Sequence, residues 1–209
     1  MIDRQYSAHR TAVLFIDFQI DVCAKGGKMV SQEADILTKF AQTRQYTAEL
    51  QERLRGELDK PLLVHIQHVY EPGYPELSNA CLTNMERYVS GQGAFIDGTE
   101  GAQIVPELQP KNGELLLKKN TLSPFASTKL HWILRKRGID TVVIAGVVTH
   151  YAVLATALSA GDLGYSVVVL KDCCMSGTQP THSVALEILE PVANVISNTE
   201  FFRMLNPSS

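Results

Sequence analysis

The sequence lacks the features that mark several classes of protein. No apolar run approaches the roughly 18 residues needed to span a bilayer, and the first ten residues, MIDRQYSAHR, contain no apolar signal core. The formal net charge is only -3, which provides no basic footprint for nucleic acid or for an anionic membrane. We therefore expect a cytoplasmic protein whose partner is a small molecule, with no nucleic-acid partner and no membrane partner.

Cysteine and tryptophan are scarce, and a linker is missing. Cys23, Cys81, Cys173 and Cys174 match neither a disulfide framework nor a CxxC zinc pair, so we expect free thiols. The last two end a predicted strand, where one side chain should face the core and the next should face away. The single tryptophan, Trp132, is expected in the core or in a subunit contact. No Pro/Gly/Ser-rich linker divides the chain, and we expect a single domain over residues 1–209.

Six short apolar runs with little polar alternation are typical of strands buried on both faces. They span residues 11–17, 61–68, 113–119, 140–146, 165–171 and 193–197, and helical patterns fall at 31–58, 127–137, 150–163 and 179–189. This alternation predicts an α/β fold, a doubly wound six-stranded parallel sheet flanked by helices. The connection over 69–112 is too long and too aperiodic for a plain crossover, and it indicates a functional covering loop.

Ligands of such sheets lie beyond the carboxyl ends of the strands, so the strand ends hold the candidate functional residues. The first strand ends in Asp17, the third in Lys118 and Lys119, and the fifth in Asp172. The two lysines should point to opposite faces of their strand. A carboxylate and an ammonium at one mouth of the sheet form either an acid–base pair or an ion pair that ties two strand ends together.

The fourth strand runs into GVVTHYAVLATALSAGDLGY, residues 146–165. This is the strand-to-helix turn at which α/β enzymes often carry a nucleophile, and Ala152 occupies that place.

Four segments together resemble the isochorismatase-like cysteine hydrolases, which include nicotinamidases, N-carbamoylsarcosine amidases and isochorismatase itself. LFIDFQIDV is similar to the aspartate strand of the family, DGTEGAQIVPEL to its GTxGxxIxPEL loop, KNTLSPF to its lysine motif, and the segment 146–165 to GxxTxxCVxxTAxxAxxxGY. The resemblance extends over residues 12–195. It implies that Asp17 is the general base, that Lys119 orients it, and that Ala152 stands at the position of the cysteine nucleophile.

The resemblance also implies a reaction and an assembly. A thiolate would attack the carbonyl of a small amide, carbamoyl or ureido compound, without a cofactor, in a homodimer or homotetramer. A helix that begins near Thr149 would aim its free amide groups at the oxyanion, after a cis peptide between Val147 and Val148. The remaining candidates for the substrate pocket are Gln19, His68, Phe125, Val148 and His150.

Three alternatives explain an alanine at the nucleophile position. In the first, the chain is an engineered form of an active amidohydrolase whose cysteine has been replaced, which the intact remainder of the motif favours. Alternatively, the chain cleaves a vinyl ether by proton transfer from Asp17, as isochorismatase does with a small residue here; His150 fits that case, although GVVTH matches the typical GVYAH only in part. In the third alternative, the chain binds a small molecule without turning it over.

A zinc site needs separate consideration, because nicotinamidases of this family hold zinc with an Asp-x-His pair and a further histidine. The corresponding strand here carries HIQH, residues 65–68. A strand places His65 and His68 on opposite faces, so they cannot both bind one ion without distortion. We therefore expect no metal.

Overall fold

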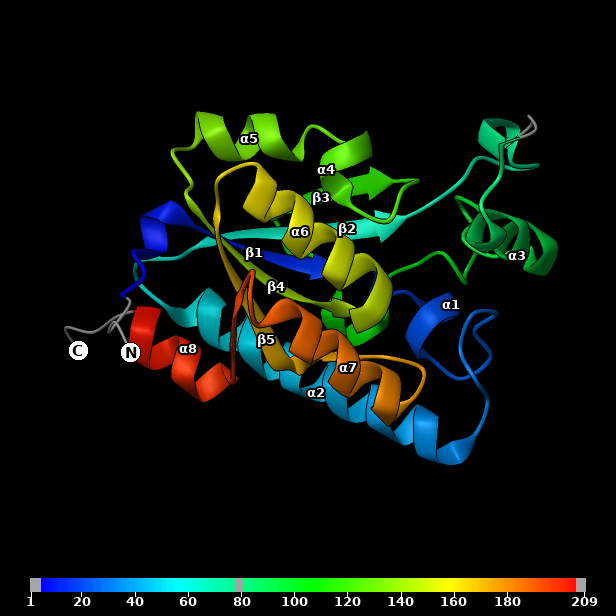
Figure 1. Ribbon diagram of the computed structural model, residues 1–209, viewed down its shortest axis with the longest axis horizontal. Helices are drawn as coiled ribbons and strands as arrows, with labels where there is room; N and C mark the ends of the chain where they lie inside the picture. The colour runs from blue at the N-terminus through cyan, green and yellow to red at the C-terminus, as the bar shows by residue number, and fades with distance from the viewer. Residues whose placement is uncertain (1–4, 78–80, 206–209) are drawn as a thin grey trace.

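The computed structural model describes residues 5–77 and 81–205. Its centre is a six-stranded sheet in the order β3-β2-β1-β4-β5-β6, and all the strand pairs are parallel (Figure 1). The strands are β1 (Thr11–Ile16), β2 (Leu62–His68), β3 (Leu115–Lys119), β4 (Thr141–Val147), β5 (Ser166–Met175) and β6 (Asn194–Ile196). The predicted α/β fold is confirmed, and each strand lies within a few residues of its expected bounds.

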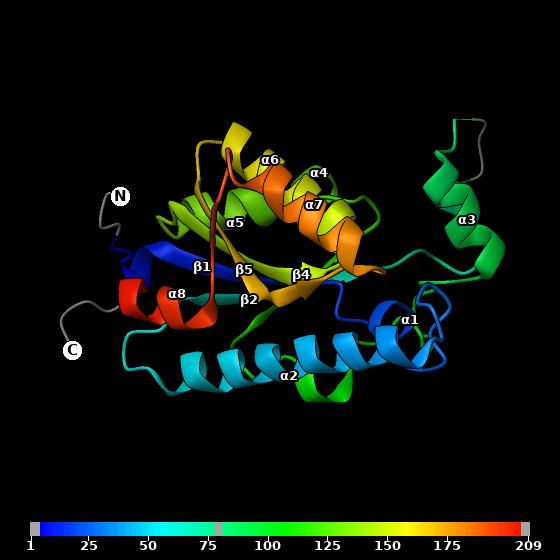
Figure 2. The same ribbon diagram turned by 60° about the horizontal axis from the view of Figure 1, so that its bottom comes forward.

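Helices cover both faces of the sheet (Figures 1 and 2). One face carries α2 (Ala34–Gly56) and α8 (Asn198–Leu205), and the other carries α5 (Leu130–Lys136), α6 (Leu154–Asp162) and α7 (Gln179–Leu189). The buried positions of α2 recur every three or four residues, as an amphipathic helix requires; they include Ile36, Phe40, Thr43, Thr47, Leu50 and Leu54. Within the described residues, no helix is long and apolar enough to cross a membrane.

The central strand β1 is buried along its whole length, and its alternate residues enter two separate cores. Val13 and Phe15 pack in the core that contains Phe40 of α2. Leu14 and Ile16 pack in the core on the opposite face of the sheet. This burial on both faces explains why the strand sequences show no polar alternation.

The strand order reverses between β1 and β4, which lie side by side in the middle of the sheet. Ile16, the last residue of β1, pairs with Gly146 near the end of β4. The chain segments that follow these two strands therefore leave the same edge of the sheet at adjacent places. In open parallel sheets this switch point is where ligands bind.

The segment expected to be a covering loop contains structure of its own. It includes the 3-10 turns η2 (Pro75–Leu77) and η3 (Pro106–Leu108) and the helix α3 (Asn84–Gln92), which projects from the body of the protein in both views (Figures 1 and 2). A capping box between Thr83 and Glu86 begins α3, and Gly93 ends it in a left-handed conformation. The helix was missed because it is short and weakly periodic.

Several other short elements complete the described chain. They are η1 (Ala8–Arg10), α1 (Ile20–Cys23), α4 (Pro124–Ser127) and the π-helical turn η4 (Thr149–Val153). The predicted helix at 127–137 divides into α4 and α5, and the predicted helix at 150–163 begins with the π turn.

The expected end of β5 is wrong. Strand β5 continues to Met175, so Asp172 does not end it, and the carboxylate of Asp172 accepts a hydrogen bond from the backbone N–H of Asn198. Cys173 and Cys174 enter opposite cores and are both buried, because helices cover both faces of the sheet. Trp132 is 62% exposed, so it lies outside the core, and a subunit contact is the expectation for it that remains. All four cysteines are free, as expected.

Candidate active site

Asp17 lies at the first step beyond β1 and turns the chain sharply. Its φ of 57° lies in the left-handed region, which aspartate tolerates better than most residues. The backbone N–H of Asp17 donates to the carbonyl of Ile66 on β2, and the carbonyl of Asp17 accepts from the N–H of Gln19. This turn directs a buried carboxylate across the carboxyl edge of the sheet.

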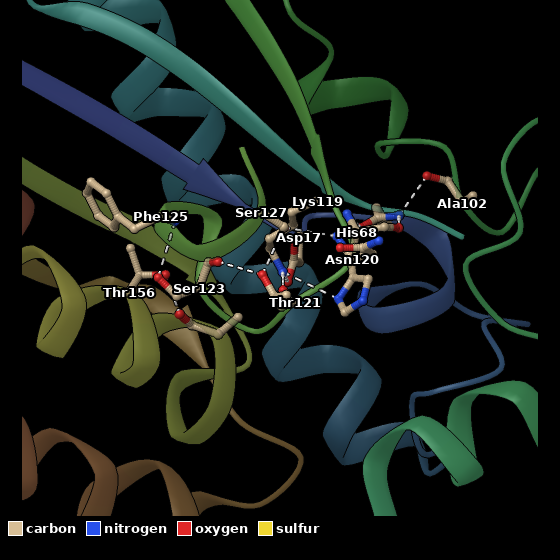
Figure 3. Close-up of polar contacts among 12 residues, drawn as sticks. Asp17, His68, Ala102, Lys119, Asn120, Thr121, Ser123, Phe125, Ser127 and Thr156 are labelled. Atoms are coloured by element: carbon tan, nitrogen blue, oxygen red, sulfur yellow. Dashed lines mark hydrogen bonds and ion pairs between the residues drawn. The ribbon is translucent and has the colours of Figure 1, made fainter. Parts of the chain in front are cut away.

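Lys119, the last residue of β3, meets that carboxylate. Its Nζ lies 2.7 Å from Oδ2 of Asp17 and 3.1 Å from the carbonyl oxygen of Thr121 (Figure 3). The expected meeting of a carboxylate and an ammonium at the mouth of the sheet is confirmed, although the two residues are 102 positions apart in the sequence. Lys118 points to the other face, as expected, and pairs with Asp97 at the surface.

Burial shifts both ionisable groups of this pair toward their neutral forms. It raises the pKa of Asp17, against the stabilising charge and hydrogen bond of Lys119. It also lowers the pKa of Lys119, against the charge and hydrogen bond of Asp17. Each group therefore depends on the other to remain ionised. A buried carboxylate with a raised pKa is a candidate for general acid–base catalysis.

His68, the last residue of β2, lies beside Lys119 because the two residues are partners in the parallel register. Nδ1 of His68 is 3.4 Å from the Lys119 ammonium. The imidazole stacks on Phe95 with 4.9 Å between ring centroids. Burial and the charge of Lys119 hold the pKa of His68 well below its usual range, so the ring is neutral. Among the described residues, neither Nε2 of His68 nor Oδ1 of Asp17 has a hydrogen-bond partner.

Gln19 links the end of β2 to the covering segment, residues 69–112, through hydrogen bonds. Its fully buried amide donates to the carbonyls of His68 and Ala102, and its oxygen accepts from the N–H of His68, each at 2.8 Å. A second amide, on Gln67, donates to the same Ala102 carbonyl. The turn after β1, the end of β2 and the covering segment are thus held by one set of hydrogen bonds.

The turn after β4 has the backbone expected from the sequence. The peptide between Val147 and Val148 is cis, and the π turn Thr149–Val153 leads directly into α6. Val148 is half-buried against the core on the α2 face, and Ala152 is buried. The hydroxyl of Thr149 lies 2.9 Å from Nδ1 of His182, which ties the start of the turn to α7. Ala152 therefore lies in the first turn of a helix that starts at the switch point.

The structure places two further pocket candidates in other contacts. His150 lies with Nδ1 2.9 Å from the hydroxyl of Ser176, and its ring packs 4.1 Å from that of Tyr151. The ring of Phe125 packs 5.8 Å from Tyr165, and in Figure 3 it points away from Asp17. These two side chains are therefore not part of the Asp17–Lys119–His68 cluster.

The two histidines of HIQH, His65 and His68, contact different charged side chains. Nε2 of His65 is 2.8 Å from the carboxylate of Glu114, which also binds Arg55, while His68 faces Lys119. Over residues 5–77 and 81–205, no three side chains of His, Cys, Asp or Glu gather in a way that could hold a metal ion. The charged group nearest to Asp17 is instead the ammonium of Lys119.

Some contributors to the site were not singled out from the sequence. Thr121 supplies a carbonyl to Lys119, and His182 and Ser176 bind the turn after β4. Thr121 lies inside the KNTLSPF motif, which could have identified it. His182 lies on α7 and Ser176 directly follows β5, and neither carries a local signal in the sequence.

Known proteins are similar to this chain in sequence and in fold. The isochorismatase family protein YwoC of Bacillus subtilis is 33% identical over 101 residues, which make up 48% of this chain and 53% of that protein. The chain thus spans about half the length of this curated relative. An isochorismatase-like hydrolase from Alkaliphilus metalliredigens superposes with a TM-score of 0.76 at 27% identity, covering 93% of this chain and 98% of the other.

A second solved structure shares the fold alone. N-carbamoylsarcosine amidase from Thermoplasma acidophilum superposes with a TM-score of 0.71 at 22% identity, covering 90% of this chain and 96% of the amidase. The family model described as the isochorismatase domain matches residues 11–200. The chain therefore belongs to the isochorismatase family of hydrolases.

Proposed function

We propose that this protein has the catalytic framework of a hydrolase that acts on a small amide, carbamoyl or ureido compound. In this framework Asp17 is the general base, Lys119 orients it, and position 152 belongs to the nucleophile. The observation that carries the proposal is the buried contact of 2.7 Å between Asp17 and Lys119 at the switch point of the sheet. An amidase among the proteins of the same fold gives further support.

The reaction follows from these positions once a thiol stands at residue 152. Asp17 takes the thiol proton, and the thiolate attacks the substrate carbonyl. The N–H groups at the start of the helix after β4 stabilise the oxyanion. The C–N bond breaks as Asp17 returns the proton to the leaving amine, and water then cleaves the thioester. Because a methyl group cannot attack a carbonyl, the chain with Ala152 is expected to be inactive in this reaction.

The test is to replace the alanine and to measure amine release. Ala152→Cys should hydrolyse at least one member of a panel of small linear amides, carbamoyl amino acids and ureides. Adding Asp17→Asn should lower the rate by about 10²- to 10⁴-fold, as the loss of a general base does. Ala152→Ser is the matched control, because it adds a polar atom without an acidic thiol.

A second candidate reaction is favoured by the small side chain at position 152 itself. Asp17, whose pKa is raised by burial, could protonate a vinyl ether without any nucleophile. Isochorismate cleavage by the chain with Ala152, together with an inert Ala152→Cys variant, would support that reaction and overturn the first proposal. Ligand binding without turnover by either form would identify a binding protein instead.

A further inference from the structure

Two buried polar atoms of the candidate site lack a partner among the described residues. They are Oδ1 of Asp17 and Nε2 of His68, which belong to two side chains that both contact Lys119. Proteins pair nearly all buried polar atoms, so unpaired atoms on both sides of one lysine indicate a place for ligand atoms. The other unpaired buried side chain of this kind, Gln51, lies on α2, outside the site.

The contacts of Lys119 determine which nitrogen of His68 carries the proton. Nζ of Lys119 faces three groups: Oδ2 of Asp17, the carbonyl of Thr121 and Nδ1 of His68. An ammonium has three N–H donors and no lone pair, so it can only donate. Nδ1 of His68 must then be an acceptor, although at 3.4 Å this is the longest of the three contacts.

Moving the proton from Lys119 to Asp17 does not change this result. The neutral amine then has two N–H donors and one lone pair, and the lone pair accepts from the protonated Oδ2. The two N–H donors remain for the Thr121 carbonyl and for Nδ1 of His68. In both states Nδ1 accepts, so the neutral ring of His68 carries its proton on Nε2.

The direction of this N–H is fixed by the packing of the ring. The imidazole lies parallel to Phe95 within 11° and packs 5.1 Å from Tyr70. Gln19 holds both the N–H and the carbonyl of the His68 backbone. Since Nδ1 faces Lys119, Nε2–H points away from it (Figure 3). His68 is therefore a rigid, neutral hydrogen-bond donor.

We propose that Nε2–H of His68 donates a hydrogen bond to the carbonyl oxygen of the substrate, and that the site selects an uncharged amide or ureide over a carboxylate. The unpaired Oδ1 of Asp17 is the complementary acceptor for an N–H of the same kind of group. The charges of Asp17 and Lys119 cancel, so the cluster offers an anion no net attraction. This inference rests on the proposed function, and it assigns the recognition step to a neutral histidine.

Two measurements on the chain with Ala152 test the inference without requiring turnover. Long-range ¹H–¹⁵N NMR correlations should show His68 protonated on Nε2. NMR titrations should show that N-methylurea or propionamide binds more tightly than propionate. His68→Gln retains an N–H donor, so its affinity for the amides should lie within about threefold of that of the parent chain. His68→Phe retains an aromatic ring but has no donor, so its affinity should be about tenfold lower, as the loss of one hydrogen bond predicts.

Any of several results would overturn the inference. These are a proton on Nδ1 of His68, unchanged amide affinity in His68→Phe, tighter binding of propionate, or no binding of either amide at millimolar concentration. If His68→Phe folds poorly, the tautomer and the propionate comparison in the parent chain decide the question. Because no cysteine takes part, an inert Ala152→Cys variant would contradict the proposed function alone.

Discussion

The carboxylate of Asp21 occupies the space in which a side chain at Gly101 would begin. A Cβ placed on Gly101 would lie 2.3 Å from Oδ1 of Asp21. The same carboxylate accepts a hydrogen bond from the N–H of Phe95, and the carbonyl of Gly101 accepts one from the N–H of Asp21. Gly101 is therefore required because α1 and the covering segment approach each other closely there. A need for an unusual backbone conformation is not the reason for a glycine at this position.

Gly101→Ala is expected to lower the free energy of unfolding by about 1–3 kcal/mol, the usual cost of forcing an extra carbon into a packed site. Gly91→Ala is the matched control, because Gly91 lies within α3 and a Cβ there would meet nothing. That control should be neutral or stabilising by up to about 1 kcal/mol, since alanine favours a helix more than glycine does. Urea unfolding of both variants gives the comparison, and equal stability would contradict the close packing.

Lys119→Met should destabilise the protein by about 3–5 kcal/mol near neutral pH, because it leaves the buried Asp17 carboxylate without its counter-ion. The pKa of Asp17 is already raised by burial and should rise further in this variant. A group whose folded pKa is raised contributes stability at low pH, which is lost as the pH rises through that pKa. The free energy of unfolding that Lys119→Met loses should therefore be small in acid and grow toward neutral pH.

The double variant Asp17→Asn with Lys119→Met provides the control for this ion pair. Without a buried charge, it should recover most of the stability that the single variant loses. Urea unfolding at several pH values measures both effects. A double variant as unstable as the sum of its two single changes would mean that the two residues do not act as a pair.

Glu114 should make stability depend on pH in the acid range. Burial alone would raise the pKa of its carboxyl, but hydrogen bonds from Arg55, the Lys111 backbone and His65 outweigh burial and lower it to about 2 from the usual 4.5. A depressed folded pKa contributes stability above the unfolded value. That stability should disappear as the pH falls from 4.5 toward 2. Urea unfolding at several pH values gives the free energy of unfolding as a function of pH. Glu114→Gln should make that free energy nearly independent of pH in this window, whereas Glu187→Gln, at an exposed position, should behave as the parent chain does.

The protein is expected to form a closed dimer or tetramer, as symmetric enzymes commonly do. Exposed apolar side chains on α5, α6 and α7, the helices that share one face of the sheet, are available for such a contact. They include Trp132, Leu158, Val184 and Ile188. Sedimentation at micromolar concentration measures the assembly, and a monomer there would contradict the expectation. Trp132 is the single tryptophan, so its fluorescence reports whether α5 joins the contact.

The architecture and the Asp17–Lys119 contact were both within reach of the sequence. Buried parallel strands leave continuous apolar runs, and parallel strands bring their carboxyl ends to one edge, so a residue that ends one run must lie near the residue that ends another. Alternation along β3 also separated Lys118 from Lys119 correctly. These inferences depend only on the periodicity of strands.

Features that depend on pairing between distant segments were not predictable. Strand β5 was expected to end at Asp172, where its apolar run stops, yet pairing of Cys174 with Gly146 carries the strand on to Met175. The hydrogen bonds of Gln19 go to His68 and to Ala102, partners that no local pattern identifies. The sequence left two places open for Trp132, the core and a subunit contact, because a seven-residue helix defines its buried face poorly; the exposed ring excludes the core.

The 102-residue separation of Asp17 and Lys119 has a consequence for biosynthesis. At a ribosomal rate of about 5–20 residues per second, Lys119 is made roughly 5–20 s after Asp17. Strand β4, the other neighbour of β1, emerges later still. During that interval the apolar strand TAVLFI has at most β2 beside it, and the aspartate that follows must stay hydrated and unpaired. The nascent amino-terminal half therefore exposes an apolar strand until β3 and β4 follow it, and Asp17 has no counter-ion until Lys119 leaves the exit tunnel.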